Sequence, residues 1–280
     1  MWRRGVVIKS ARELELMRAA GKVNARALAA AAAAAVPGAT TADVDAAAVD
    51  VLKAHGAESA FKGYPGPYPY PAVTNVSVND VLVHGIPGPR KLKEGDIVSI
   101  DCGSIVEGFV ADSALTVAVG EVSDEARRIM EVTLASLYAG IDQMRVGRRT
   151  GDVSAAIQAY VEKNGFQVVR EYTGHGVGRN MHEDPQVPNY GRRGKGLPLR
   201  PGMTIALEPM VLIENWETRI LEDQWAVASR NGKLTAHYEH SVAVTEDGPL
   251  VLTAWDGDLD EEMVIRYNRY FAGRIRPEEE

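Results

Sequence analysis

Apolar and polar positions near the start of the chain follow the pattern of an amphipathic helix with a defined beginning and end. Ser10 and Glu13 have the spacing of a capping box, in which each side chain bonds the backbone N–H of the other residue. The helix is expected to continue through an alanine tract and to end by Val36. Pro37 and Gly38 follow there, removing a backbone donor and supplying a flexible residue.

Further along, the pattern changes between helix and strand several times. Thr41 is expected to cap a second helix that runs through His55. Residues 63–71 are rich in proline, glycine and tyrosine and are predicted to form a loop. Strands are predicted after this loop, with residues 106–119 among them, and helices over 124–144 and 150–164. Helices and strands that cluster in this way predict an α+β fold.

Two segments recur later in the chain at nearly the same distance. Residues 41–47 resemble residues 150–156 at an offset of 109, and residues 92–101 resemble residues 199–208 at an offset of 107. Because both matches keep the same order, we interpret them as an internal duplication.

The duplication predicts one catalytic domain over residues 1–280, with halves at approximately 10–120 and 121–255. Each copy of the second segment is expected to be a strand that ends on a carboxylate, Asp101 in the first half and Glu208 in the second. If the halves are related by a pseudo-twofold axis, these two carboxylates meet near it. Pockets commonly form where such halves meet.

Composition narrows the class of protein. With 31 basic and 38 acidic residues the formal net charge is −7, and no run of Lys and Arg is long enough to suggest nucleic-acid binding. The longest apolar run, residues 27–36, is shorter than the roughly 20 residues that span a bilayer. Residues 1–9 lack the apolar core of a secretory signal. A single cysteine, Cys102, suits a reducing compartment, so the expected location is the cytoplasm.

Four carboxylates are candidates for chemistry because they lie in strand-like, largely apolar segments. Asp101 and Asp112 are joined by a short glycine-containing connection that favours a hairpin. Glu208 ends a predicted strand, and Glu239 lies on an alternating strand. Each one alone could pair with a buried Arg or Lys. Together they would repel, by about 4 kcal/mol for two charges at 4 Å and an effective dielectric constant of 20, unless they shared a cation or a proton.

Histidines add to this set. His175 lies among three glycines, and His84 precedes a Gly-Ile-Pro turn from which it could face a substrate. Four carboxylates and one imidazole suit two divalent ions such as manganese, iron, cobalt or zinc. Such paired ions activate water, so hydrolysis is the expected reaction class. His55 and His240 are expected to be structural.

The segments that carry these residues resemble, in order and spacing, those of the type I methionine aminopeptidases in the short form seen in bacteria. That family belongs to the pita-bread metallopeptidase superfamily. Only 25 residues separate His182 from Glu208, which leaves no room for the subdomain that type II relatives insert there. The matching segments are residues 84–87, 100–101, 109–113, 174–178, 182–185, 207–210 and 238–240.

The resemblance implies a pita-bread fold, with two pseudo-symmetric halves around a curved antiparallel sheet. It also implies an enzyme that removes the initiator methionine from a peptide or nascent chain, acting as a monomer, with transient ribosome association left open. Glu208, His182 and His84 would be catalytic, with Glu208 carrying the proton and the two histidines contacting substrate. The implied ligands of two metal ions are Asp101, Asp112, His175, Glu208 and Glu239, with Asp112 and Glu239 bridging both ions.

Departures from the family fall in the pocket for the substrate side chain. Phe61 and Asn75 stand where many bacterial relatives have cysteine, and Met181 stands where phenylalanine is frequent. With Tyr70 and Trp225 these residues are expected to form an apolar substrate pocket. Asn75 is expected to bond the backbone of the proline-rich loop and to turn away from substrate. The altered pocket leaves open cleavage of Xaa-Pro peptides, and a non-catalytic peptide-binding relative is a further alternative.

Overall fold

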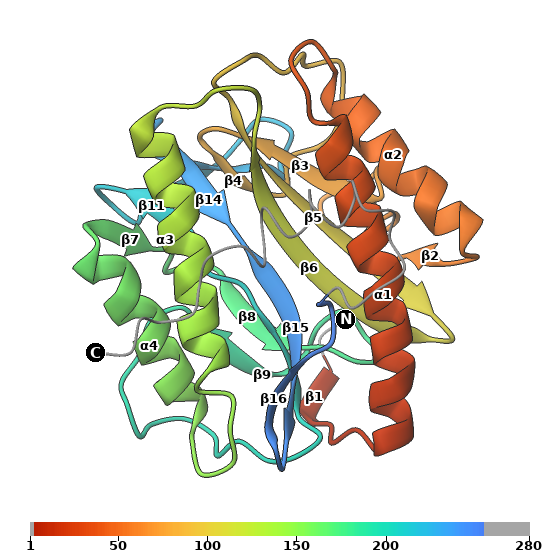
Figure 1. Cartoon of the computed structure of the whole chain (residues 1–280), viewed down its shortest axis with the longest axis vertical. Coiled ribbons are helices and arrows are strands. Elements are labelled where there is room, and N and C mark those ends of the chain that lie inside the picture. Colours follow the sequence, from red (N-terminus) through yellow and green to blue (C-terminus); the bar gives the residue numbers. More distant parts are fainter. Residues whose placement is uncertain (1–2, 255–280) are drawn as a thin grey trace.

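The structure, a computed structural model, describes residues 3–254 of the chain. Residues 1–2 and 255–280, the two ends of the predicted single domain, lie outside the described residues. Within the described part, helices and strands are mixed and clustered, as the sequence predicted (Figure 1). The helices are α1 (Ala11–Ala34), α2 (Thr41–Ala54), α3 (Asp124–Ile141) and α4 (Thr150–Lys163).

Local capping sets where the first two helices begin. The capping box of α1 is present, with the Ser10 hydroxyl accepting from the Glu13 N–H and the Glu13 carboxylate accepting from the Ser10 N–H. The prediction for α2 was wrong by one residue, because Thr40 is the N-cap and pairs with Asp43 three residues later. Thr41 instead bonds the backbone of Gly88, accepting from its N–H and donating to its carbonyl.

Ten strands form the main sheet, and all of its pairs are antiparallel except that of β1 with β9. Its order is β1-β9-β8-β10-β15-β6-β5-β2, with β16 beside β15 and β3 beside β5. The strands are β1 (Arg3–Val6), β2 (Glu58–Ser59), β3 (Thr74–Val78), β5 (Ile97–Val106), β6 (Phe109–Ala118), β8 (Thr173–Gly176), β9 (Glu183–Pro188), β10 (Thr204–Leu207), β15 (Glu239–Thr245) and β16 (Gly248–Val251).

Two smaller three-stranded sheets complete the β-structure of the described residues. One has the order β14-β11-β7 and the other β12-β13-β4. The strands are β4 (Val81–Val83), β7 (Phe166–Val168), β11 (Met210–Ile213), β12 (Thr218–Ile220), β13 (Val227–Ser229) and β14 (Thr235–His237).

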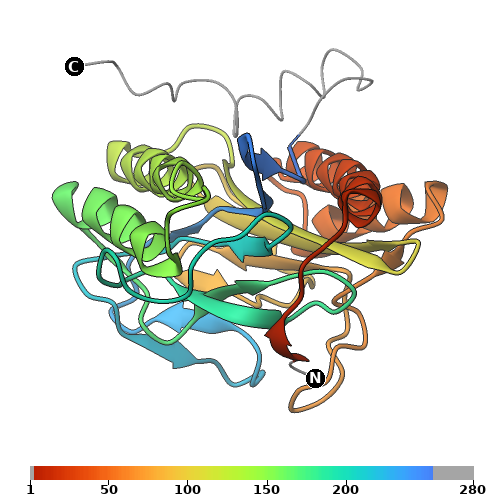
Figure 2. The same cartoon turned by 90° about the horizontal axis from the view of Figure 1, so that it is seen from below.

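The four helices lie on one side of the sheet in two pairs, α1 with α2 and α3 with α4 (Figures 1 and 2). Helices α2 and α4 have 14 residues each, and their first residues are Thr41 and Thr150. The main apolar core fills the space between helices and sheet, with Leu28, Ile100 and Leu137 fully buried in it. The helices therefore cover one face and leave the other for the remaining strands and loops.

The hairpin predicted between Asp101 and Asp112 is present as β5 and β6, with Gly103 opposite Asp112. Asp101, however, does not end its strand as predicted, because β5 continues five residues further to Val106. The extra length arises because β6 pairs with β5 along its whole length. The strand predicted to end on Glu208 ends one residue earlier, because β10 is Thr204–Leu207 and Glu208 follows it directly.

The beginning of the chain is tied to a segment far along the sequence. Strand β1 pairs in parallel with β9. The buried ammonium group of Lys9 donates to the carboxylate of Glu183 at 2.7 Å, and both side chains are almost completely buried. A paired and hydrogen-bonded ion pair of this kind avoids the cost of leaving either charge alone in the interior. In residues 3–254 no helix has the length and apolar character that a bilayer crossing requires.

Candidate metal centre and substrate cavity

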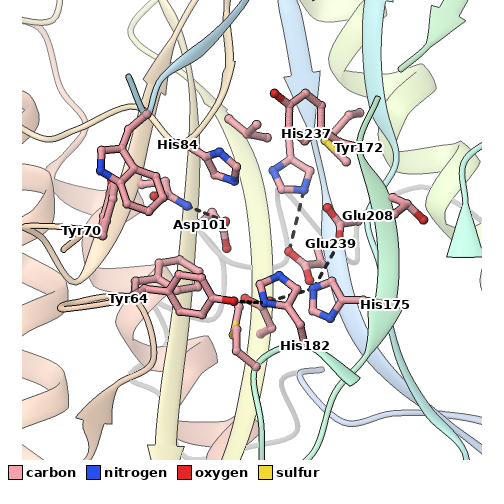
Figure 3. Close-up of a pocket in the computed structure, with 18 of the residues that line it drawn as sticks. Tyr64, Tyr70, His84, Asp101, Tyr172, His175, His182, Glu208, His237 and Glu239 are labelled. Atoms are coloured by element: carbon pink, nitrogen blue, oxygen red, sulfur yellow. Dashed lines mark hydrogen bonds and ion pairs between the residues drawn. The ribbon is translucent and has the colours of Figure 1, made fainter. Parts of the chain in front are cut away.

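A cavity of about 270 Å³ is lined by side chains of the main sheet, of the smaller sheets and of the loops between them. Both halves of the chain line it, with contributions from β3, β5 and β6 on one side and from β8, β11 and β15 on the other. The proline-rich loop closes one wall. Figure 3 shows the polar side chains of this cavity directed toward one another.

The five predicted metal ligands meet in this cavity. Asp112, His175 and Glu239 each place one ligand atom within 4.8 Å of the others. The His175 Nε2 atom lies 3.4 Å from Glu208 Oε1 and 3.7 Å from Asp112 Oδ2. Asp101 completes the group on β5, next to the strand that carries Asp112. Residues separated by more than a hundred positions in the sequence thus form one cluster.

Burial and mutual charge act strongly on the four carboxyl groups. Burial raises the pKa of Asp101 to about 7, and hydrogen bonds from its neighbours limit that rise. Burial, followed by the neighbouring negative charges, raises the pKa values of Asp112, Glu208 and Glu239. Like charges that cannot all ionise together require either protons or cations.

The contacts of the four carboxyl groups bear on whether the cluster binds protons or cations. Within residues 3–254 none of the four carboxylates forms an ion pair with Lys or Arg, so the alternative of a buried basic partner fails there. Three of their oxygens are buried without a hydrogen-bond partner among the described residues: Asp101 Oδ1, Asp112 Oδ1 and Glu239 Oε1. Buried polar atoms of native proteins are normally satisfied, so these oxygens fit a divalent cation that binds between them.

His175 has the form that a metal ligand requires. Its Nδ1 lies 2.9 Å from the backbone carbonyl of Gly176, so Nδ1–H donates there and leaves Nε2 as the acceptor that faces the carboxylates. Burial lowers the pKa of His175 to about 4, which keeps the imidazole neutral near pH 7. A neutral ring with an oriented lone pair is the usual ligating form of histidine.

The two histidines expected to contact substrate both line this cavity, and Figure 3 shows His182 beside His175 and His84 apart from both. His182 packs with its ring centroid 4.3 Å from that of His175. His84 follows β4 in the left-handed region, at φ 59°, and its ring bonds the backbone of Trp225. Burial lowers the pKa of His84 to about 4 and that of His182 to about 3, so both rings are neutral near pH 7.

The residues predicted to form the apolar pocket lie together in the cavity. Phe61 and Tyr70 pack together in one small cluster, with Met181 and Trp225 against it. The Tyr70 and Trp225 rings meet edge to face at 5.2 Å, and the Tyr70 hydroxyl donates to the backbone carbonyls of Thr74 and Gly85. The pocket wall is therefore aromatic and apolar, with the Tyr70 hydroxyl bonded to the backbone and the Trp225 indole N–H buried without a hydrogen-bond partner among the described residues.

The expectation for Asn75 was wrong. Its side-chain N–H₂ donates to Asp101 Oδ2 at 2.9 Å, and the residue is buried. The proline-rich loop is not its side-chain partner. Position 75 pairs directly with position 101 across β3 and β5, so strand register brings the amide to the carboxylate.

Tyr64 and His237 are among the polar residues of the cavity that sequence reasoning missed. The hydroxyl of Tyr64, in the proline-rich loop, lies 2.6 Å from His182 Nδ1. His237 is buried with its Nε2 3.8 Å from Glu239 Oε2 and without a hydrogen-bond partner among the described residues. Alternation could have identified His237, because it lies two residues before Glu239. No pattern in the sequence connects Tyr64 with His182.

The other two histidines lie outside the cavity. His55 is exposed and bonds the backbone carbonyl of Val51, and His240 is buried against Thr253 with its Nδ1 at 2.8 Å from the hydroxyl. Neither lines the cavity.

Comparison with known proteins decides the family. The model of metallopeptidase family M24 matches residues 15–246, which is most of the chain and includes every residue of the cluster. The chain belongs to this metallopeptidase family. A methionine aminopeptidase of Clostridium acetobutylicum is 46% identical to this chain over 249 residues, an alignment that covers 89% of this chain and 98% of the relative. Methionine aminopeptidase 1 of Mycobacterium tuberculosis is 45% identical over 258 residues, covering 90% and 96%.

Solved structures show the same fold. A methionine aminopeptidase from Thermotoga maritima aligns with a TM-score of 0.87 at 44% identity, covering 90% of this metallopeptidase and all of that chain. A prolidase from Pyrococcus furiosus aligns with a TM-score of 0.73 at 24% identity, covering 90% of this chain and 66% of that one, a likeness of fold alone. The predicted pita-bread fold is confirmed. The boundaries of the two halves stay a prediction.

Proposed function

We propose that this metallopeptidase removes the N-terminal methionine from new polypeptides. The observation that carries the proposal is the cluster of four buried carboxylates and one neutral imidazole beside an aromatic, apolar pocket. The similarity to methionine aminopeptidases over 89% of the chain supports it. The first residue of a peptide would place its side chain in the pocket and its carbonyl group at the cluster.

In this proposal, the residues that bind the two divalent ions are largely buried and all line the cavity. Asp112, His175 and Glu239 would hold the ions together, because one ligand atom of each lies within 4.8 Å of the others, and His175 Nε2 also lies 3.4 Å from Glu208 Oε1. The full set is Asp101, Asp112, His175, Glu208 and Glu239.

When bound, paired divalent ions activate water and polarise the scissile carbonyl. Glu208 is the group that we assign to take and return the proton, since its side chain is 14% exposed whereas those of Asp112 and Glu239 are 3% and 2% exposed. The backbone carbonyl of Glu208 accepts from the side chain of Asn189, which fixes the turn that presents the carboxylate. General acid–base catalysis of this kind contributes about 10² to 10⁴ in rate.

His84 and His182 would bind the peptide on either side of the reacting carbonyl. If the Tyr64 hydroxyl donates to His182 Nδ1, the ring proton lies on Nε2, where it can donate to the oxygen of the substrate. His84 is held by its bond to the backbone of Trp225 and keeps its other nitrogen for substrate. Neither ring is needed to hold an ion in this arrangement.

Changing either histidine to alanine should therefore separate catalysis from metal binding. We expect His84→Ala and His182→Ala each to lose about 10² to 10³ in turnover, the usual cost of a lost oxyanion donor, while they retain two ions. Steady-state kinetics combined with elemental analysis of the purified proteins checks this. A variant that lost its metal would instead place that histidine among the ligands.

The shape of the pocket favours methionine as the first residue. An unbranched thioether adapts to an irregular apolar wall and gains from contact with aromatic edges such as those of Tyr70 and Trp225. A difference of one methylene is worth only about 1 to 3 kcal/mol in such a pocket, so norleucine should be accepted with a modest loss.

A panel of four peptides tests the proposed function. Metal-loaded protein should cleave Met-Ala-Ser with a higher kcat/KM than Leu-Ala-Ser, Gln-Ala-Ser or Ala-Pro-Ser. Faster cleavage of Ala-Pro-Ser would assign Xaa-Pro specificity, and faster cleavage of Gln-Ala-Ser would show that the polar edge of the pocket binds the side chain. Failure to cleave any of them would refute the peptidase assignment.

The setting of this reaction is also a proposal. The one cysteine, Cys102, is free and buried, which suits a reducing compartment such as the cytoplasm. New polypeptides appear there on ribosomes, so transient association with the ribosome would bring the protein to its substrate.

A further inference from the structure

Asn75 and Asp101 form a closed pair in the wall of the cavity. The two residues lie directly opposite each other on the antiparallel strands β3 and β5. The Asn75 amide donates to Asp101 Oδ2 at 2.9 Å, and Asn75 is 6% exposed and Asp101 9% exposed. Because the backbone of both residues is fixed by the strand ladder, their side chains have little freedom to separate.

The two oxygens of the Asp101 carboxylate have different surroundings in this pair. Oδ2 accepts from Asn75, whereas Oδ1 is buried and has no hydrogen-bond partner among residues 3–254. The backbone of Cys102 and the carboxyl group of Asp112 lie close to this carboxylate and, like Asn75, lower its pKa. A planar carboxylate held at one oxygen by a neutral donor presents its other oxygen in a single direction, here toward the remaining ligand groups.

We propose that Asn75 is a positioning residue of the metal centre, which holds Asp101 so that Oδ1 binds the ion, and that its main effect is on metal affinity. The proposal rests on the proposed function only in taking Asp101 as a ligand. Groups that orient metal ligands typically contribute 10-fold to 100-fold in metal affinity or activity. A cysteine at this position would offer only a weak S–H donor.

The alternative role for Asn75 is direct contact with substrate, since the same side chain lines the cavity. The two roles make different demands on the amide. A substrate contact would alter the KM and the order of preferred first residues without changing metal affinity. A positioning role changes metal affinity in the absence of any peptide, and the loss in turnover is recovered when metal is added in excess.

A second Asn–Asp pair, at the ends of the same two strands, supplies a matched control. Asn79 donates its amide to Asp96 Oδ1 at 2.8 Å, so this second Asn–Asp pair lies between the end of β3 and the start of β5. It does not line the cavity. Asn79 has φ 60°, a conformation that glycine accepts readily, so Asn79→Gly removes this second bond without backbone strain.

The experiment is calorimetric titration of metal-free protein with Mn²⁺ and with Co²⁺, without peptide. In Asn75→Ala we expect one of the two binding steps to weaken by about 10-fold to 100-fold, while Asn79→Gly keeps the affinity of the unaltered protein. The visible spectrum of the Co²⁺-loaded protein should change in Asn75→Ala, because a ligand oxygen has lost its orientation. At saturating metal, the KM for Met-Ala-Ser should stay within about threefold.

Unchanged affinity at both steps in Asn75→Ala, or an equal loss in Asn79→Gly, would overturn the proposal. Thermal unfolding of each metal-free variant checks that it is folded. If the alanine variant is not, Asn75→Ser, which keeps a hydroxyl donor, takes its place and should bind metal less tightly than the unaltered protein. A protein that binds two ions but cleaves no methionyl peptide would refute the proposed function and leave this test intact.

Discussion

Replacing Asp112 with alanine is expected to remove both metal ions together and, with them, all measurable peptidase activity. A ligand atom of Asp112 lies within 4.8 Å of those of His175 and Glu239. Its Oδ1 atom is buried without a hydrogen-bond partner among the described residues. If Asp112 binds both ions, as the resemblance to the family implies, its loss takes a ligand from each of them. Elemental analysis of the purified variant and hydrolysis of Met-Ala-Ser provide the two measurements.

Asp96 supplies the control for that experiment. It lies at the start of the strand that carries Asp101, but its carboxylate accepts from the Asn79 side chain and the Lys93 backbone outside the cavity. Asp96→Ala should therefore keep two ions. An Asp112→Ala protein that retained one ion would show that Asp112 serves a single site, and activity in metal-free protein would refute the metal-dependent reading altogether.

Glu208→Gln is expected to lower turnover by about 10² to 10⁴ with a much smaller change in KM. The amide keeps the size of the side chain and one oxygen that can bind an ion, but it can no longer take a proton. In the unaltered protein, burial and the charge of Asp101 raise the pKa of Glu208, so the group binds a proton more readily than an exposed glutamate does. Single-turnover kinetics at saturating peptide measures the effect.

The metal content of the Glu208→Gln protein must match that of the unaltered protein before the rates are compared. If the variant retains more than about a tenth of the original turnover with both ions present, the proton passes through another group of the cavity. The ring of His237, whose Nε2 is buried without a hydrogen-bond partner among the described residues, would then be the next group to test.

Much of the fold and most of the cluster could be predicted because their signals are local. A capping box needs only Ser10 and Glu13, and a hairpin needs only the short turn between β5 and β6. The shift of the α2 cap from Thr41 to Thr40 arose because two adjacent threonines both offer a hydroxyl, and only the position of Asp43 decides between them.

What could not be predicted depends on register between distant segments. The partner of Asn75 is set by which residue of β5 lies across from it, and a shift of one position would turn the amide to the other face. The contact of Tyr64 with His182 joins a loop to a segment 118 residues later. Strand propensity and alternation identify faces but do not specify such pairs.

The pairing of β1 with β9 affects the order in which parts of the chain fold during synthesis. Lys9 and Glu183 are 174 residues apart, so the partner of Lys9 is made roughly 10 to 35 s after it at translation rates of 5 to 20 residues per second. Helices and hairpins form in microseconds, so α1 and the β5–β6 hairpin can form and pack long before then. The first strand therefore waits for its partner until β9 has been made, and the high sequence separation makes their pairing a slow step with a large entropic cost.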